Sequence, residues 1–351
     1  MRRRTNQRRD DPIITAPHPS LRRPVAAATA TILGLSLATL VPAERAVGAP
    51  EIPTFCAGTA PIVASAIGSS VDVRTCAIQG RLVVLPLGNG PDSIGPHVPA
   101  AGRGVTNVAL AVDGEYELTV TNTGDAVTVE TSTPKTSTAT GPAASGDNTV
   151  VPDADPACSE TAFNLEGHRW TSTVRWFYNE STVSRVGLNL SATIADIRAG
   201  NFNMTTGQNN CGFATGAFSS SGSFQGDTSL FANIDSGGNC TSRFPDGQNT
   251  VSWGPTTSGT LLAETCFEFS GGTMTEGDIY IASNKGIVDS FPASCSNKYD
   301  LQSVATHEWG HVYGLAHETG GVDEVMYPTS FACALRRHLG RGDYNAMNQY
   351  Y

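Results

Sequence analysis

Alternating apolar and polar positions mark the chain between residues 50 and 130. Residues 105–112 and 116–129 each alternate, and an Asp-Gly pair at 113–114 separates the two runs. Alternation with a period of two predicts strands buried on one face, and Asp-Gly between such runs predicts a hairpin. A second candidate turn lies at 123–125. The pattern therefore predicts a small β-rich domain over residues 50–130.

The second half of the chain mixes strand and helix patterns. Apolar residues at helical spacing predict an amphipathic helix at 186–197, and another helix after Asp300, a candidate N-cap. Residues 200–258 are rich in Gly, Ser, Asn and Thr, which predicts mainly loops. Runs of aromatic and apolar residues predict strands at 169–179, 249–253, 261–269 and 277–281. We expect an α+β domain over residues 158–351.

Two further stretches complete the organisation of the chain. Residues 1–49 have a basic start, an apolar run at 25–41 and a small-residue end, which is the build of a secretory signal peptide. An uncleaved signal anchor is the alternative, although the apolar run is short for a membrane span. Residues 131–157 are rich in Thr, Ala, Pro and Gly and have almost no large apolar side chains. They therefore predict a flexible linker.

Charge and cysteine content narrow the class of protein. The first 49 residues contain eight arginines and three acids, so the remainder carries 14 basic and 29 acidic side chains, a net charge of −15. This argues against nucleic acid and anionic membranes as partners. All eight cysteines follow residue 49, which predicts four disulfides in an exported chain. The sequence does not fix their connectivity; the pairing we adopt is Cys56–Cys76, Cys211–Cys240, Cys266–Cys295 and, by elimination, Cys158–Cys333.

Candidate chemistry gathers in the stretch HEWGHVYGLAH, residues 307–317. His307 and His311 are four residues apart, which on a helix places both imidazoles on one face, close enough to share a metal ion. Glu308 is placed to act on a metal-bound water without being a ligand. Gly314 can adopt the left-handed conformation that ends a helix, so that His317 returns toward the metal. Three imidazoles leave a tetrahedral zinc with one open position, which is the catalytic arrangement.

This stretch matches HExxHxxGxxH and resembles the metzincin metalloproteases. Residues 323–328, DEVMYP, look like the methionine-containing Met-turn of that family. Their Met-Tyr-Pro sequence is most similar to the matrixin branch. Where related enzymes carry a tyrosine ligand, this chain has Pro328. The resemblance covers residues 158–351. It implies a metzincin-type domain with a short twisted, mostly parallel sheet, an active-site helix, a Met-turn and a C-terminal helix, whose last strands form an edge that pairs with an extended substrate.

The resemblance also implies an activity and the role of each site residue. The reaction would be hydrolysis of peptide bonds in proteins at one catalytic Zn²⁺. His307, His311 and His317 would be the metal ligands, and Glu308 would be the general base and then the acid. Met326 would not bind the metal but would support the three imidazoles from below.

The zinc motif does not determine which further ligands and partners the protein binds. Family members often bind calcium, and loops containing acidic residues could hold a structural Ca²⁺ here: Asp227, Asp235 and Asp246. Residues 318–332 should line the pocket that receives a substrate side chain. We expect a secreted, monomeric protein that acts on proteins or peptides and has no stable association with membranes after signal removal.

The position of residues 50–130 is where a metzincin carries its propeptide. The PRCGxPD motif, with which matrixin propeptides block the zinc, is absent, and Cys56 and Cys76 have the wrong neighbours. A propeptide of another kind and a permanent accessory domain both remain open. The alternative to a protease is a secreted binding or adhesion protein in which residues 50–130 carry the function and the metalloprotease-like domain is secondary.

Overall fold

The computed structural model describes residues 52–88, 90–134, 158–321 and 323–351. The predicted signal peptide and most of the predicted linker lie outside these residues. Residues Glu51–Tyr351 form one compact unit. Within the described ranges, no helix is both long and apolar enough to cross a membrane. We refer to residues 52–134 as the N-terminal region and to residues 158–351 as the C-terminal region.

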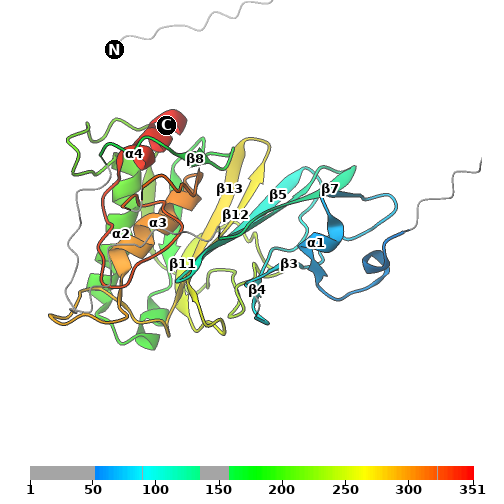
Figure 1. The fold of residues 1–351 in the computed structure, drawn as a ribbon, viewed down its shortest axis with the longest axis horizontal. Helices are drawn as coiled ribbons and strands as arrows, with labels where there is room; N and C mark the ends of the chain where they lie inside the picture. Colours follow the sequence, from blue (N-terminus) through cyan, green and yellow to red (C-terminus); the bar gives the residue numbers. More distant parts are fainter. Residues whose placement is uncertain (1–51, 89, 135–157, 322) are drawn as a thin grey trace, which may run out of the picture. The chain divides into compact units, whose positions relative to one another are not determined.

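A nine-stranded sheet runs through both regions in the order β10-β9-β11-β13-β12-β5-β6-β7-β2 (Figure 1). The C-terminal region supplies β9 (Val174–Tyr178), β10 (Gly222–Asp227), β11 (Asn249–Gly254), β12 (Leu261–Ser270) and β13 (Thr273–Ala282). The N-terminal region supplies β2 (Ser70–Asp72), β5 (Arg103–Ala111), β6 (Gly114–Asn122) and β7 (Ala126–Ser132).

Smaller sheets and a few helices complete the fold. The small sheets comprise β1 (Ile62–Val63) with β3 (Val83–Pro86) and β4 (Ser93–Ile94), β14 (Ile287–Val288) with β15 (Tyr299–Asp300), and β16 (Leu315–Ala316) with β8 (Asn164–Leu165). The α-helices are α1 (Ala64–Ile67), α2 (Leu190–Thr206), α3 (Leu301–Val312) and α4 (Arg341–Tyr350). Two 3₁₀ helices span η1 (Thr54–Ala57) and η2 (Glu180–Arg185).

The C-terminal region has the predicted mostly parallel sheet. Strands β10, β9, β11 and β13 are parallel, and β12 is antiparallel to β13. Strand β11 has a parallel neighbour on each side and all six of its residues are buried, although only Val251 and Trp253 are large apolar residues. Helices α2 and α3 pack closely where α2 carries Gly200, since a Cβ there would lie 2.8 Å from the backbone nitrogen of Thr306. The predicted α+β architecture is thus observed.

Helix α2 differs from the predicted helix at 186–197. It begins at Leu190, where the Asn189 side chain accepts a hydrogen bond from the Ala192 backbone nitrogen at 3.1 Å, and it extends to Thr206. The prediction ended too early because the last turns bury polar side chains. Asn201 donates to the Tyr313 hydroxyl at 3.0 Å, so an amide occupies a position where an apolar residue was expected.

The N-terminal region contains the predicted hairpin. Strands β5 and β6 pair in register from Ala111↔Gly114 onward. The alternating run at 116–129 is two strands, because the second candidate turn at 123–125 separates β6 from β7. On β6 the alternate residues Tyr116, Leu118 and Val120 are buried in the core of this region, as the period of two predicted.

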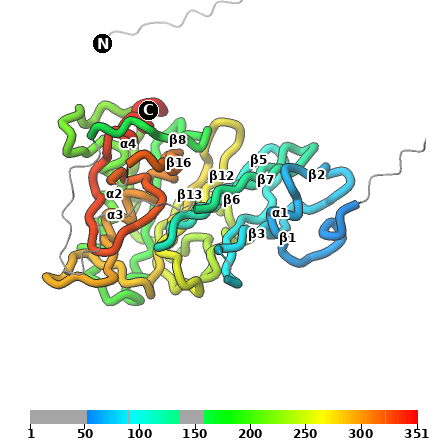
Figure 2. The backbone as a smooth tube through the Cα atoms, in the orientation of Figure 1, coloured from blue at the N-terminus to red at the C-terminus, as the bar shows by residue number. Residues whose placement is uncertain are grey.

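The two regions meet where β5 pairs with β12. The pairing is antiparallel and extends from Leu261↔Ala111 to Phe269↔Gly104. Figure 2 shows β5 and β6 running alongside β12 and β13, although the segments are far apart in the sequence. Arg103 of β5 also forms an ion pair with Glu268, whose side chain is almost completely buried. The strand edge that the sequence assigned to a substrate is therefore paired with a strand of the same chain.

Each region also has a hydrophobic core of its own. The largest core of the C-terminal region contains only residues from that region, including Trp176, Trp253 and Trp309. The core of the N-terminal region takes one buried residue, Leu261, from the C-terminal region. Because the larger core needs no side chain from residues 52–134, the C-terminal region has the interior of an independent domain.

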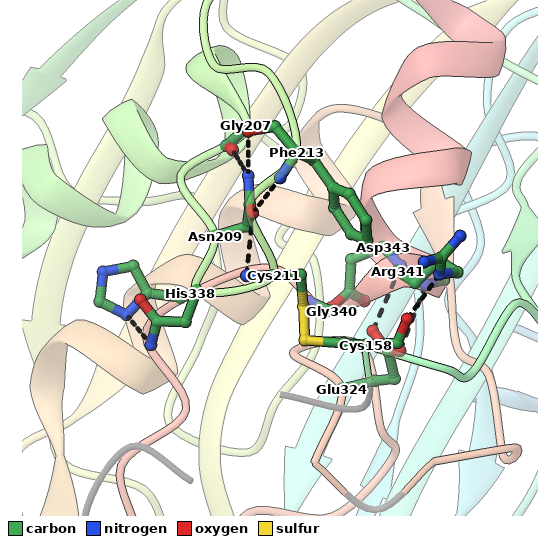
Figure 3. Close-up of a disulfide and its surroundings, with 12 residues drawn as sticks. Cys158, Gly207, Asn209, Cys211, Phe213, Glu324, His338, Gly340, Arg341 and Asp343 are labelled. Atoms are coloured by element: carbon green, nitrogen blue, oxygen red, sulfur yellow. Dashed lines mark hydrogen bonds between the residues drawn. A yellow bond between two sulfur atoms is a disulfide. The ribbon is translucent and has the colours of Figure 1, made fainter. Parts of the chain in front are cut away.

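Four disulfides include one of the predicted pairs. Cys56–Cys76 is present, but the other three are Cys158–Cys211, Cys240–Cys266 and Cys295–Cys333. All four observed disulfides join consecutive cysteines of the chain, and spacing alone does not decide between this pairing and the predicted one. Figure 3 shows the Cys158–Cys211 disulfide, beside which the Cys158 carbonyl oxygen accepts a hydrogen bond from Arg341 Nε of α4 at 2.5 Å.

Candidate metal centre and its proton acceptor

Helix α3 carries the first half of the site. Its N-cap is Asp300, as predicted, whose carboxylate accepts from the Ser303 backbone nitrogen at 2.9 Å. His307, Glu308 and His311 are all buried on this helix, with the Glu308 and His311 side chains fully buried. The helix is covered on nearly all sides, which fixes the orientation of its polar side chains.

The chain then turns back at Gly314, as the spacing predicted. Gly314 has φ +90°, and a Cβ there would lie 2.2 Å from the His168 carbonyl oxygen, so only glycine fits. The short strand β16 follows and pairs with β8. His317 comes next, and the Asn164 side chain donates to its carbonyl oxygen at 2.6 Å. The turn and this pairing bring the third imidazole beside the first two.

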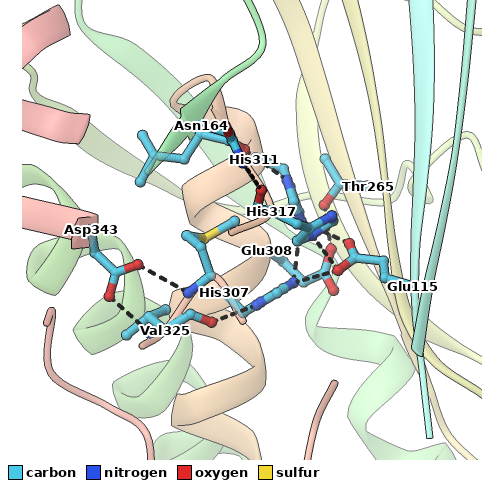
Figure 4. Close-up of polar contacts among 11 residues, drawn as sticks. Glu115, Asn164, Thr265, His307, Glu308, His311, His317, Val325 and Asp343 are labelled. Carbon is cyan, nitrogen blue, oxygen red and sulfur yellow. Dashed lines mark hydrogen bonds and ion pairs between the residues drawn. The ribbon is translucent and has the colours of Figure 1, made fainter. Parts of the chain in front are cut away.

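Four side chains converge at this point (Figure 4). The Nε2 atoms of His307 and His311 are 3.2 Å apart, and those of His311 and His317 are 2.8 Å apart. Glu115 of β6 joins them: its carboxylate lies 3.0 Å from His311 Nε2 and 3.4 Å from His307 Nε2, and it also contacts His317 Nε2. Four ligands of a tetrahedral zinc would lie ~3.3 Å from one another, so the spacing suits such an ion.

The hydrogen bonds behind the imidazoles show that this group needs a cation. His307 Nδ1 lies 2.7 Å from the Val325 carbonyl oxygen, and His311 Nδ1 lies 2.9 Å from the Leu315 carbonyl oxygen. Since a carbonyl oxygen only accepts, both Nδ1 atoms must donate, and in the neutral imidazole Nε2 is left with a lone pair. These lone pairs point at one another and at the Glu115 carboxylate. A bound metal ion resolves this conflict, so the residues fit a metal site.

Charge in the site agrees with that interpretation. Burial would raise the pKa of Glu115, but the three imidazoles hold it well below its usual range. Burial would likewise lower the pKa of His307, but the Glu115 carboxylate raises it to about 9. Burial lowers the pKa of His317 to about 3, which keeps this imidazole neutral. The ionised Glu115 carboxylate thus favours a positive charge beside it, which either a proton on His307 or a bound metal ion can supply.

Glu308 lies beside the imidazoles rather than among the converging atoms. The Thr265 hydroxyl of β12 donates to its Oε2 at 2.5 Å. Its Oε1 is buried and has no hydrogen-bond partner among the described residues. Burial raises the pKa of Glu308 to about 8. One oxygen is thus fixed by Thr265 of β12, while the other has no hydrogen-bond partner among the described residues.

The predicted Met-turn segment lies under the imidazoles. Met326 is buried, and its sulfur would be 2.2 Å from a Cβ at Gly310, so the methionine packs directly on α3. Asp343 of α4 holds this segment, because its carboxylate accepts from the backbone nitrogens of Val325 at 2.8 Å and Met326 at 3.0 Å. The same segment supplies the carbonyl oxygen that orients His307.

Comparison with known proteins agrees with this geometry. Residues 199–351 match the matrixin family. This segment is matrixin-like. The match runs from the second half of α2 to the end of the chain and does not include residues 52–134. Matrixins are zinc metallopeptidases, and the mixed α/β architecture of the matrixin-like segment fits the metzincin fold. No curated protein matches the chain.

Sequence reasoning missed three functional neighbours of the motif. Glu115, Thr265 and Asp343 reach the site from other strands and from α4. No local pattern marks Glu115 as different from other acids of its strand, and only the pairing of β5 with β12 brings it to the histidines. Asp343 lies in the first turn of α4, where an acid ordinarily indicates only a helix start.

Other predicted ligands are not brought together. In the described ranges, the one group of three or more metal-ligating side chains is the histidine and Glu115 group, and Asp227, Asp235 and Asp246 are not part of it. Asp235 instead accepts hydrogen bonds from its own loop, from the Gly237 and Asn239 backbone nitrogens. Calcium binding remains a prediction.

Proposed function

We propose that the chain is a secreted zinc-dependent endopeptidase. The observation that carries the proposal is the convergence of His307, His311 and His317 on one point, with Glu308 beside them and one of its oxygens free. Zinc held by the three imidazoles would polarise the scissile carbonyl and lower the pKa of a water. The matrixin match over residues 199–351 supports the same chemistry.

The chain's own residues supply the proton transfer. Glu308 Oε1 takes the proton of the attacking water and gives it to the leaving amine, so that no covalent intermediate is needed. Thr265 fixes the other oxygen, which keeps the carboxylate in one orientation during both transfers. Met326 and the Val325 carbonyl support and orient the imidazoles from below.

The substrate would be an extended segment of a protein. Strand β12 is the terminal strand of the sheet that the C-terminal region builds, and its backbone can pair with an added strand. Thr329 of the predicted pocket wall lines a cavity beside His307. The Glu318 carboxylate, by contrast, accepts from the Gly320 and Gly321 backbone nitrogens within its own loop. Secretion rests on residues 1–49 and agrees with the four disulfides.

A comparison of two proteins tests the proposal. Casein hydrolysis is measured for the C-terminal region, released from the chain by proteolysis, and for its Glu308→Gln variant. Gln keeps the shape and can still accept from Thr265, so only the proton acceptor is lost. We expect kcat/KM to fall about 10²–10⁴-fold, with an unchanged zinc content. A zinc chelator should abolish the remaining hydrolysis.

The alternative function gives the opposite result. A binding or adhesion protein would retain stoichiometric zinc but would cleave neither casein nor a peptide library. Equal activity of the native and Glu308→Gln proteins would contradict the role of Glu308 and leave the metal site without its proposed base.

A further inference from the structure

The N-terminal region places one acidic side chain where the metal would need an open position. Glu115 is the second residue of β6, directly after the turn at 113–114, and 4% of its surface is exposed. Neither carboxylate oxygen has a hydrogen-bond donor among the described residues. Its contacts are the three imidazoles. A buried carboxylate without other partners is costly unless it binds a cation, so this position indicates a metal ligand.

The strand beside Glu115 occupies the edge of the C-terminal sheet. Strand β5 pairs with β12 over almost its whole length, antiparallel and by main-chain hydrogen bonds. An extended peptide that adds to a sheet edge uses the same backbone groups. The backbone of β12 that Leu261–Ser270 offers on this side is therefore already used by the chain itself.

A third group of the same hairpin lies beside the metal site. Leu110 is the β5 partner of Glu115, so the two side chains share one face of the hairpin. Leu110 is buried against Val304 of α3 and lines a cavity that is also lined by His307, Tyr327 and Thr329. That cavity has a volume of about 20 Å³, which is room for roughly one water. The Leu110 side chain of the hairpin thus lines the small cavity next to the metal site.

We infer that the β5–β6 hairpin is an internal inhibitor, in which Glu115 is the fourth metal ligand and β5 occupies the place of a substrate strand. The inference rests on the proposed function. Three imidazoles and a carboxylate complete a tetrahedral set and leave no position for water. Full activity then requires that the hairpin leave both the metal and β12. The N-terminal region is accordingly a latency device that uses a glutamate.

The test uses the full chain with Co²⁺ in place of zinc, because the visible spectrum of Co²⁺ reports its ligands. The variants are Glu115→Ala and Glu115→Gln. Glu117→Gln is the matched control, since Glu117 lies two residues further on the same strand face but is not in the metal group. We expect the spectrum of Glu115→Ala to differ from the native one and to titrate near pH ~7, as a metal-bound water does. Native and Glu117→Gln spectra should agree and should not titrate there.

Acetohydroxamate, a small metal-chelating ligand, is then added as a probe of access. If the native hairpin leaves the metal about 1% of the time, the apparent Kd is about 100-fold weaker than for Glu115→Ala. Glu115→Gln should keep the fold of the hairpin and bind the probe more tightly than the native chain. Casein should remain uncut by Glu115→Ala, because β5 still covers β12.

The outcomes separate this inference from the proposed function. Identical Co²⁺ spectra and equal hydroxamate affinity in the native and Glu115→Ala proteins would overturn the inference, whatever their activity. The expected spectra together with a released C-terminal region that cuts no peptide would uphold Glu115 as a ligand and overturn the endopeptidase proposal. Rapid casein cleavage by the intact native chain would overturn latency.

Discussion

The two regions bring different kinds of groups to the same point. The C-terminal region supplies three imidazoles and the Glu308 carboxylate, and the carbonyl oxygens of Val325 and Leu315 orient two of the imidazoles. The N-terminal region supplies a single carboxylate, Glu115, which has no support of its own at the site. The imidazoles can therefore hold a metal without the hairpin, whereas Glu115 is satisfied only when the metal site is beside it.

The two halves of the sheet also differ, in strand direction and in the burial of their residues. The C-terminal half is mostly parallel, and its central strand β11 has no exposed residue. The N-terminal half is antiparallel, and β6 alternates buried and partly exposed positions. Two architectures are joined by one antiparallel pairing, β5 with β12. Because Leu261 of β12 lies in the core of the N-terminal region, we expect weakening of the joint to disturb that core more than the largest core of the C-terminal region.

The largest expected effect concerns Leu110, which lines the small cavity beside His307. Leu110→Ala should cost about 2–5 kcal/mol, as buried leucines usually do. Because Leu110 packs on the C-terminal region, we expect faster amide hydrogen exchange in β12 with little change in β7. Leu118→Ala is the matched control, since Leu118 lies in the core of the N-terminal region, and it should accelerate exchange in β7. Unchanged exchange of β12 in Leu110→Ala would show that the joint does not depend on this contact.

A second prediction concerns how the C-terminal region supports its imidazoles. Asp343→Ala removes the acceptor of two backbone nitrogens in the segment that orients His307. Loss of such outer support should weaken metal affinity about 10–100-fold, as measured by competition with a chelator. Asp323→Asn, in the same segment but partly exposed and paired with Arg336, should leave the affinity unchanged. Equal affinities of the two variants would mean that the imidazoles are held without Asp343.

Sequence patterns over short stretches predicted the features that depend only on local backbone geometry. The spacing of His307 and His311 fixes a shared helix face, and Gly314 fixes the turn that returns His317, so these residues could be placed from the sequence. Period-two alternation likewise predicted the hairpin of the N-terminal region, because one of its faces is buried in a core.

Long-range contacts could not be predicted in this way. Glu115 reaches the imidazoles only through the pairing of β5 with β12, and no pattern within either strand specifies that partner. The end of α2 was missed because Asn201 is satisfied by a tertiary hydrogen bond to Tyr313, which a hydrophobic pattern does not record.

The smallest expected effect concerns a partly buried acid that, unlike Glu115, is not part of the metal-ligating group. Asp196 lies on α2, and its Oδ2 is buried without a hydrogen-bond partner in the described ranges. Burial, and then the charge of Asp300, raises its pKa to about 7. Between the unfolded pKa of about 3.9 and this value, the folded state holds a proton that the unfolded state has lost. Stability contributed by this group therefore falls as pH rises from 4 to 7.

Asp196→Asn should remove this pH dependence of stability. The variant therefore tests whether the ionised Asp196 carboxylate destabilises the C-terminal region. We expect the variant and native chain to have similar Tm values at pH 4, and the variant to have the higher Tm at pH 8. Asp125→Asn, at an exposed turn of the N-terminal region, is the control and should shift Tm little at either pH. A Tm difference for Asp196→Asn that is equal at both pH values would place its effect in packing. In that case the carboxylate of Asp196 would not cost stability when it is ionised in the folded state.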